Sequence, residues 1–168
     1  MSAKKKSLTG LVGFAAAALL YALVPAHEGE VLSTYKDPVG ILTVCYGDTD
    51  PAMAIPGVTY TREECRQSLE RQLYAHAEPV LACTPVLDGH PEQLAAAVSL
   101  AYNIGSSNYC KSTVARRFNA GDWAGACAAF GMWTKAKGKV LPGLVRRRAD
   151  EAALCEKNLP ANPPSVRK

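Results

Sequence analysis

The sequence predicts a mainly α, α+β protein with two lobes: a small β-hairpin lobe, an interlobe helix and a helical C-terminal lobe. Three observations support this prediction. The 168 residues suit one modest domain, or two lobes that share a core, rather than two independent domains. Alanine-rich stretches with few β-branched residues favour helix. Strand-forming residues gather in one short run, Ile41–Tyr46, directly after a turn.

The N-terminal segment has the pattern of an export signal. Three lysines within residues 1–6 precede residues 7–26, which carry no charge. Three interpretations compete: a cleaved signal peptide, a permanent membrane span, and a weak anchor that can leave the membrane. The eight strongly apolar residues would gain only about 2 to 5 kcal/mol on insertion. They span Leu8–Val24, which is near the short limit for crossing a bilayer, so a permanent anchor is the weakest interpretation.

A β-hairpin is predicted next, within a lobe of about residues 27–60. Residues 27–34 are expected to form the end of the leading helix or a turn after it. Lys36–Gly40 is rich in turn-forming residues, and the strand-forming run Ile41–Tyr46 follows it. A loop rich in glycine, aspartate and proline, Gly47–Gly57, completes the lobe.

The interlobe helix is predicted over about residues 61–78. The Thr61 hydroxyl can cap its first turn, and Glu64 three residues later completes a capping box. Pro79 is expected to end the helix, because proline disrupts a helix interior. A helix of this length is sufficient to bridge two lobes.

Helical patterns fill most of the remaining lobe, about residues 79–157. After Pro91, apolar residues recur on one helix face. A basic loop, Lys135–Pro142, precedes the last helix, and residues 158–168, which include three prolines, are expected to form a flexible tail. The other helices are expected at 112–118, 123–133 and 144–156.

Charge and cysteine spacing exclude several classes of function. The net charge of +4 is too small to indicate nucleic-acid binding, and no RNA-binding motif or zinc-ligand spacing is present. A mildly basic surface suits a polyanionic substrate such as a cell wall. The six cysteines lie at least 17 residues apart, so there is no CxxC motif. Disulfides are favoured over buried free thiols, with 15 possible connectivities.

A group of carboxylates near the hairpin could support glycosidic bond cleavage, which needs one protonated and one ionised carboxyl group. Glu28 follows the apolar run, which would desolvate it and favour its protonated form. Asp37 lies in the turn, and the Thr43 hydroxyl could orient a water molecule. By chemistry alone, Glu28 and Asp37 are two of several candidate carboxylates in this region: Glu28, Glu30, Asp37, Asp48 and Asp50.

The spacing of these residues resembles the phage lysozymes of glycoside hydrolase family 24. The sequence has a Glu28-Gly29 pair, a Tyr35-x-Asp37 turn and a Gly40-x-x-Thr43 strand. In that family the catalytic Glu, Asp and Thr occupy relative positions 0, +9 and +15, which Glu28, Asp37 and Thr43 match. The resemblance extends over roughly residues 27–157 and implies a lysozyme-like fold.

The resemblance implies an endolysin that hydrolyses the β-1,4 bond between N-acetylmuramic acid and N-acetylglucosamine in peptidoglycan, and so lyses the host cell. Glu28 would be the general acid, and Asp37 would be the base that positions water. Thr43 would assist Asp37. Members are described as inverting, which implies carboxyl groups far enough apart to admit water. No cofactor or metal is expected. The residues that would line the sugar-binding cleft, or alternatively serve in packing and helix capping, are Tyr46, Tyr102 and Asn103.

The resemblance also implies three disulfides. Family-like neighbours suggest Cys83–Cys110 and Cys127–Cys155 within the helical lobe, which leaves Cys45–Cys65 to join the hairpin to the interlobe helix. One departure from the family stands at Asp48, where many members have histidine, so a structural polar contact is expected to differ there.

The N-terminus resembles the signal-anchor-release type within this family. Residues 1–26 would then be the anchor, with residues 7–26 tethering the inactive enzyme to the host inner membrane until release into the periplasm. Retention of this segment is favoured over cleavage after Ala26, which would leave Glu28 as the second residue of a fraying chain end. We expect a monomer that does not bind nucleic acid. The alternatives are an inactive wall- or membrane-binding relative and a chitin-type glycosidase.

Overall fold

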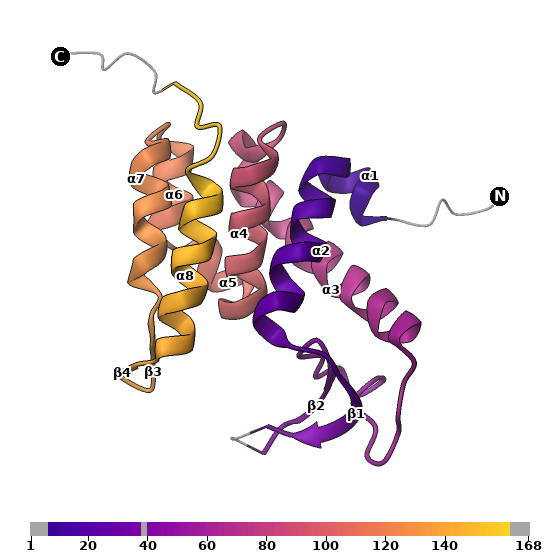
Figure 1. Ribbon diagram of the computed structural model, residues 1–168. Helices are drawn as coiled ribbons and strands as arrows, with labels where there is room; N and C mark the ends of the chain where they lie inside the picture. The colour runs from indigo at the N-terminus through magenta and orange to yellow at the C-terminus, as the bar shows by residue number, and fades with distance from the viewer. Residues whose placement is uncertain (1–6, 38–39, 162–168) are drawn as a thin grey trace.

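The computed structural model describes residues 7–37 and 40–161, which form two lobes (Figure 1). A helical lobe makes up most of the chain, and a small lobe built around a β-hairpin lies at one end of it. The long helix α3 (Arg62–Cys83) runs from the small lobe into the helical lobe. The predicted mainly α, α+β fold with two lobes is therefore confirmed.

The apolar N-terminal segment forms two helices that pack into the helical lobe. Helix α1 (Leu8–Val12) and helix α2 (Phe14–Glu28) are separated by Gly13, whose φ of 82° suits glycine. Helix α2 lies against α4 (Pro91–Ile104), and α1 lies against α3. Among the described residues, none of the helices combines the length and the apolar character needed to cross a membrane. The buried residues that join the main hydrophobic core are Leu8, Ala16, Ala17, Leu20 and Val24.

The expected end of the anchor segment, at residue 26, falls within α2 rather than at an element boundary. Helix α2 continues to Glu28 and ends at Gly29, whose φ of 74° turns the chain into the small lobe. The division of the chain into an anchor and an enzyme domain stays a prediction.

The small lobe contains the predicted hairpin. Strand β1 (Val31–Lys36) pairs with strand β2 (Leu42–Cys45) in antiparallel register, with Tyr35 opposite Thr43. Pro38 and Val39 of the predicted turn lie outside the described residues. The lobe has a small core of its own, formed by Val44, Cys45 and Cys65 with Leu32, Tyr46, Met53 and Tyr60 packed against it.

Helix α3 begins as predicted but ends later. The Glu64 N–H donates to Thr61 Oγ1 at 3.2 Å, and the Thr61 N–H donates to Glu64 Oε2 at 2.7 Å, which completes the predicted capping box. The predicted end at residue 78 was wrong, because the helix continues through Pro79 to Cys83. Proline removes one hydrogen bond from the helix, but Val80 beyond it is fully buried and Cys83 is held by a disulfide. Tertiary packing therefore outweighs the local preference.

Helix α4 is the centre of the helical lobe. Its residues 93–101 are all buried, and α2, α3 and α8 (Pro142–Cys155) pack around it. The shorter elements that complete the lobe are η1 (Pro85–Leu87), α5 (Ser106–Cys110), α6 (Thr113–Asn119), α7 (Trp123–Ala128) and the 3-10 helix η2 (Ala129–Met132).

Two predictions for residues 123–142 were wrong in detail. The single helix expected over 123–133 is divided into α7 and η2, a segment that contains two glycines, which weaken helix. The expected basic loop contains a short antiparallel hairpin, β3 (Lys135–Ala136) and β4 (Lys139–Val140). Its turn residues, Lys137 and Gly138, have φ values of 50° and 77°, as a tight two-residue hairpin turn requires.

Three disulfides stabilise the fold, and they are the pairs that the family resemblance implied: Cys45–Cys65, Cys83–Cys110 and Cys127–Cys155. The first joins the end of β2 to the first turn of α3, and the other two lie within the helical lobe. Of the expected C-terminal tail, residues 162–168 lie outside the described residues, as does the lysine-rich start of the chain.

Candidate active site

Glu28 occupies the junction of the two lobes. It is the last residue of α2, and its side chain, which is 20% exposed, forms an ion pair with Nη1 of Arg147 on α8. On the other side, a Cβ atom placed on Gly47 would lie 3.1 Å from Glu28 Oε2. Gly47 also has a φ of 78°. The carboxylate of Glu28 is thus enclosed between an arginine of the helical lobe and a glycine of the small lobe.

Arg147 is itself held by the core of the helical lobe. Its side chain is 5% exposed, its Nε donates to Glu151 Oε1 at 3.1 Å, and its Nη2 donates to the Ser99 carbonyl at 3.2 Å. The fully buried Glu151 also accepts from Ser99 Oγ at 2.6 Å and from Arg148 Nη2 at 2.9 Å. Acidic and basic groups therefore alternate from Glu28 into the core, and each buried charge has an opposite neighbour.

No sequence motif assigned a role to Arg147, Arg148 or Glu151. They lie within residues 27–157, the segment over which the family resemblance extends. Their spacing in the sequence could have predicted these ion pairs. Residues three and four apart share a helix face, so Glu151 can contact both arginines. The contact from Arg147 to Glu28 spans 119 residues of sequence and has no such local signal.

Asp37 and Thr43 lie together on the hairpin, and both bond to the backbone of Ile41. Oδ1 of the half-buried Asp37 accepts from the Ile41 N–H at 2.8 Å. The buried Thr43 hydroxyl donates to the Ile41 carbonyl at 3.1 Å. A further bond from the Asp37 N–H to the same carbonyl, at 2.9 Å, closes the turn. The N–H and carbonyl groups of Ile41 therefore fix the positions of the Asp37 and Thr43 side chains.

The three residues expected to line a cleft have protein partners. The Tyr46 hydroxyl donates to Glu30 Oε1 at 2.9 Å, and burial together with this bond raises the pKa of Tyr46. The Tyr102 hydroxyl donates to the Tyr46 carbonyl at 2.6 Å. Burial, and then the charges of Glu28 and other acids, raise the pKa of Tyr102 well above its usual range. Asn103 Oδ1 accepts from Arg148 Nη1 at 3.2 Å.

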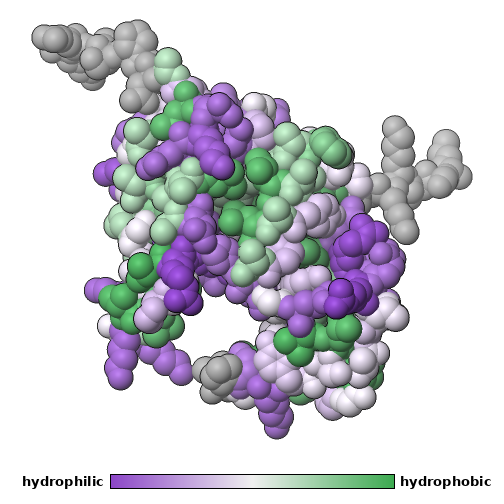
Figure 2. All heavy atoms as spheres, in the orientation of Figure 1, coloured by the Kyte–Doolittle hydropathy of each residue, from purple (hydrophilic) through white to green (hydrophobic). Residues whose placement is uncertain are grey.

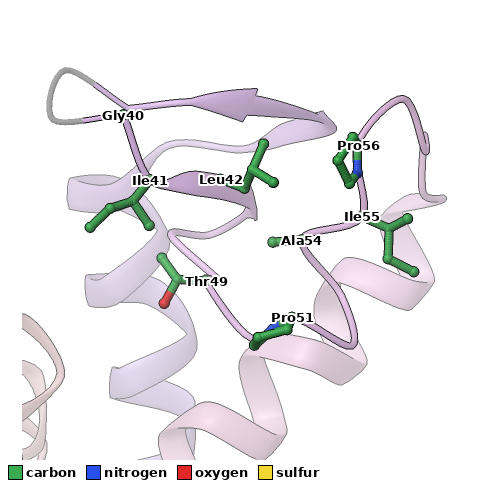
Figure 3. Close-up of a pocket in the computed structure, with 8 residues that line it drawn as sticks. All are labelled: Gly40, Ile41, Leu42, Thr49, Pro51, Ala54, Ile55 and Pro56. Atoms are coloured by element: carbon green, nitrogen blue, oxygen red, sulfur yellow. The ribbon is translucent and has the colours of Figure 1, made fainter.

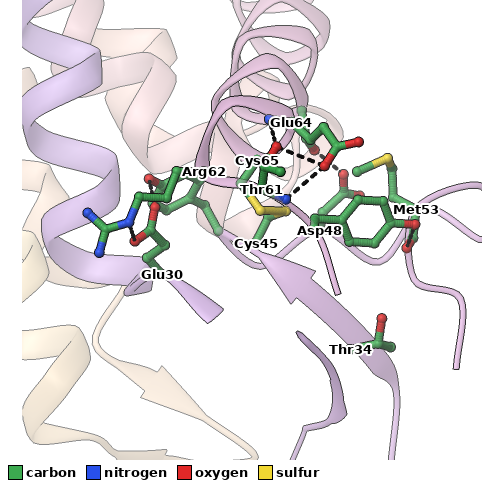
Figure 4. The surroundings of a disulfide bond; sticks show 12 residues. Glu30, Thr34, Cys45, Asp48, Met53, Thr61, Arg62, Glu64 and Cys65 are labelled. Carbon is green, nitrogen blue, oxygen red and sulfur yellow. Dashed lines mark hydrogen bonds and ion pairs between the residues drawn. A yellow bond between two sulfur atoms is a disulfide. The ribbon is translucent and has the colours of Figure 1, made fainter. Parts of the chain in front are cut away.

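Asp48 forms a structural contact between the small lobe and α3. It is 3% exposed, and its carboxylate accepts from the Ser68 hydroxyl of α3 and from the Asp50 N–H at 2.9 Å. The nearby disulfide Cys45–Cys65 and the capping box of α3 hold the same junction (Figure 4). Beside them, Arg62 Nε lies 3.5 Å from Glu30 Oε2 (Figure 4).

A pocket of about 500 Å³ lies in the small lobe, beside the strand that carries Thr43 (Figure 3). Its lining has no acidic or basic side chain: Gly40, Ile41, Leu42, Thr49, Pro51, Ala54, Ile55 and Pro56. Such a surface can contact apolar groups but offers no carboxyl group for bond cleavage. In the part of the chain that the structure describes, no group of three His, Cys, Asp or Glu side chains is placed to hold a metal ion.

Comparisons with known proteins agree with this architecture. The family model described as "Phage lysozyme" matches residues 25–151. The SAR-endolysin of Bacteriophage PS119 is 41% identical over 129 residues, which cover 76% of this chain and 75% of the relative. The SAR-endolysin of Enterobacteria phage P21 is 35% identical over 158 residues, which cover 90% and 94% of the two chains.

A solved structure of a P22 lysozyme mutant superimposes with a TM-score of 0.69 at 32% identity, over 82% of this chain and 94% of that one. The matched family segment includes the whole hairpin, α3, α4 and most of α8, and therefore every residue described above around Glu28. The chain belongs to the phage lysozyme family.

Proposed function

We propose that this lysozyme is an endolysin that hydrolyses the β-1,4 bond between N-acetylmuramic acid and N-acetylglucosamine, with Glu28 as the general acid. The observation that carries the proposal is the placement of Glu28 between Arg147 of the helical lobe and Gly47 of the small lobe. A general acid must be held in one position relative to the leaving oxygen. The buried network behind Arg147 supplies that rigidity.

Asp37 and Thr43 would act on the water molecule that attacks the sugar. In an inverting reaction the base deprotonates a water on the face of the sugar opposite the acid. Asp37 sits on the hairpin turn, on an element separate from α2, which carries Glu28. Because the Ile41 peptide groups hold both Asp37 and Thr43, a carboxylate and a hydroxyl are presented together.

The N-terminal segment would tether the enzyme to the host inner membrane before its release into the periplasm. Support comes from the names of the two relatives, both SAR-endolysins, and from the sequence of residues 7–26. In the structure, Leu8, Leu20 and Val24 are buried in the protein core. The same apolar side chains cannot face lipid and this core at once, so Glu28 at the end of α2 would reach Arg147 only after release.

The identity of the cleaved bond is tested by digesting purified sacculi and determining the products by mass spectrometry. The proposal predicts fragments whose new reducing end is N-acetylmuramic acid, with inverted anomeric configuration in an early NMR spectrum. A new reducing end on N-acetylglucosamine would contradict it. Chitin serves as the second substrate, and faster cleavage of chitin than of sacculi would favour the chitin-type alternative.

Tethering is tested separately with liposomes. Protein inserted into liposomes should degrade added peptidoglycan far more slowly than the same protein released into detergent-free buffer. Equal rates for the two preparations would contradict the proposed control by the membrane segment, and would leave the proposed chemistry unaffected.

A further inference from the structure

The hairpin β3–β4 carries a concentration of positive charge on the helical lobe. Lys135, Lys137 and Lys139 are all exposed, and none of them forms an ion pair with another residue in the described part of the chain. The segment from Gly131 to Ala149 contains no aspartate or glutamate. Three ammonium groups are therefore presented to solvent without a local counter-charge.

The backbone of this hairpin fixes where the charges point. Lys135 pairs with Val140, and Ala136 pairs with Lys139. Paired residues share a face of a hairpin, so Lys135 and Lys139 lie on opposite faces, and Lys137 occupies the tight turn between them. A further hydrogen bond from the Leu141 N–H to the Thr134 carbonyl, at 3.0 Å, closes its base. Such an arrangement is largely formed before any ligand binds, which lowers the entropic cost of binding.

The hairpin leads directly into α8, the helix whose Arg147 pairs with Glu28. Helix α8 begins at Pro142, and Arg147, which contacts Glu28, follows five residues later. Five residues of α-helix extend about 7.5 Å. Figure 1 shows β3–β4 at the end of α8 that faces the small lobe. In Figure 2 the same region projects beside a gap between the helical lobe and the small lobe.

We propose that the β3–β4 hairpin is a substrate arm that binds the carboxylates of the peptide stems of peptidoglycan. The inference deepens the proposed function and rests on it. Peptide stems attached to the glycan carry free carboxylates, which are ionised at neutral pH and complement the unpaired lysines. Beside the lysines, Met132 and Val140 are 65% and 56% exposed and can contact the alanine methyl groups of the stems. The arm would favour strands that still carry their peptides.

The test compares two double variants with the same change in net charge. Lys137→Gln/Lys139→Gln removes two charges from the arm, and Lys111→Gln/Lys157→Gln removes two from exposed positions elsewhere in the helical lobe. Each is assayed on peptide-bearing glycan strands and on strands stripped of peptides by an amidase. The wild type should prefer peptide-bearing strands, and the arm variant should lower that preference about three- to tenfold, mainly through KM, because each exposed ion pair contributes only a modest free energy.

The matched control should keep the wild-type preference, and added salt should reduce the difference between wild type and arm variant. Equal losses on both kinds of strand would overturn the proposal, as would equal losses in the control. Loss of binding to phosphatidylglycerol vesicles with an unchanged preference would assign the arm to an anionic membrane surface instead. A wild type that cleaves neither kind of strand would refute the proposed function itself, whereas an active wild type without a preference would refute only the arm.

Discussion

The two sides of the candidate site are held by different kinds of interaction. Glu28 is paired with an arginine that belongs to a buried network of charges in the helical lobe. Asp37 and Thr43 lie on a hairpin and are held by the peptide groups of Ile41. The first arrangement depends on the packing of the whole helical lobe, and the second is local. Damage to the first side should therefore reduce stability and activity together, whereas damage to the second should reduce activity alone.

On the hairpin side, replacing Asp37 is expected to have a large effect on activity and to separate activity from stability. Asp37→Asn removes the proposed base but can still accept the Ile41 N–H bond. We expect kcat/KM on sacculi to fall about 10²- to 10⁴-fold, while the free energy of unfolding changes by less than about 0.5 kcal/mol. Steady-state kinetics and urea denaturation measure the two quantities. Asp88→Asn, an exposed position in the helical lobe, should leave both unchanged.

Replacing Glu151, on the helical side of the site, should reduce stability and activity together. Glu151→Ala leaves Arg147 and Arg148 buried without the carboxylate between them, and we expect the free energy of unfolding to fall by about 3 to 5 kcal/mol. Activity should fall as well, because Arg147 loses a partner that fixes it against Glu28. Asp150→Asn is the control, since Asp150 is 62% exposed. A Glu151→Ala protein with wild-type stability would show that the network does not stabilise the helical lobe, and wild-type activity would show that it does not support Glu28.

The contrast between the two sides also explains what could be predicted from the sequence. The hairpin and the capping box of α3 depend on neighbouring residues, so turn formers and the Thr61–Glu64 spacing predicted them. The continuation of α3 through Pro79 depends on the burial of Val80, which no local pattern reports. For the same reason the pairing of Glu28 with Arg147 was not predicted, because it joins the first and last long helices of the described chain.

The candidate residues themselves were found by family spacing, and physical chemistry did not single them out. Glu28 was one of several carboxylates near the hairpin. The structure adds that its side chain lies at the lobe junction, while Asp48, another of those carboxylates, is buried in a contact with Ser68. The roles of Glu28, Asp37 and Thr43 stay predictions, and so do the sugar contacts of Tyr46, Tyr102 and Asn103.

Removing the disulfide of the small lobe should destabilise the hairpin side of the site more than the helical lobe. Cys45→Ala/Cys65→Ala opens a link that spans 20 residues, for which we expect a loss of about 2 to 4 kcal/mol. Hydrogen exchange should accelerate in β1 and β2 more than in α4. The matched comparison is Cys83→Ala/Cys110→Ala, which should have its main effect in the helical lobe. Uniform acceleration in the first variant would show that the two lobes do not unfold separately.

The smallest expected effect is a dependence of stability on pH that arises in the helical lobe. Burial lowers the pKa of His76, whose Nδ1 lies 3.0 Å from Ser106 Oγ. The unfolded chain therefore binds a proton more readily than the folded protein. This contribution to stability is present above the unfolded pKa, about 6.5, and is lost as pH falls below it. His76→Gln should flatten the decline in stability between pH 7 and 5 by about 1 kcal/mol or less.

Urea denaturation at a series of pH values measures this slope. His90→Gln, which leaves His76 in place, should retain the wild-type decline. His27, whose pKa is also lowered by burial and by Arg147, contributes in the same direction, so some slope should remain in His76→Gln. An unchanged slope in that variant would contradict the assignment to His76.

The assignment of Glu28 as the catalytic acid is tested by comparing kcat/KM on sacculi for Glu28→Gln and Glu30→Gln. The two positions lie two residues apart, and Glu30 pairs with Arg62 at the surface of the same junction. With both variants shown to be folded, we predict that Glu28→Gln lowers kcat/KM at least about 10³-fold, and that Glu30→Gln stays within about tenfold of the wild type. A folded Glu28→Gln protein with activity comparable to that of Glu30→Gln would contradict the assignment.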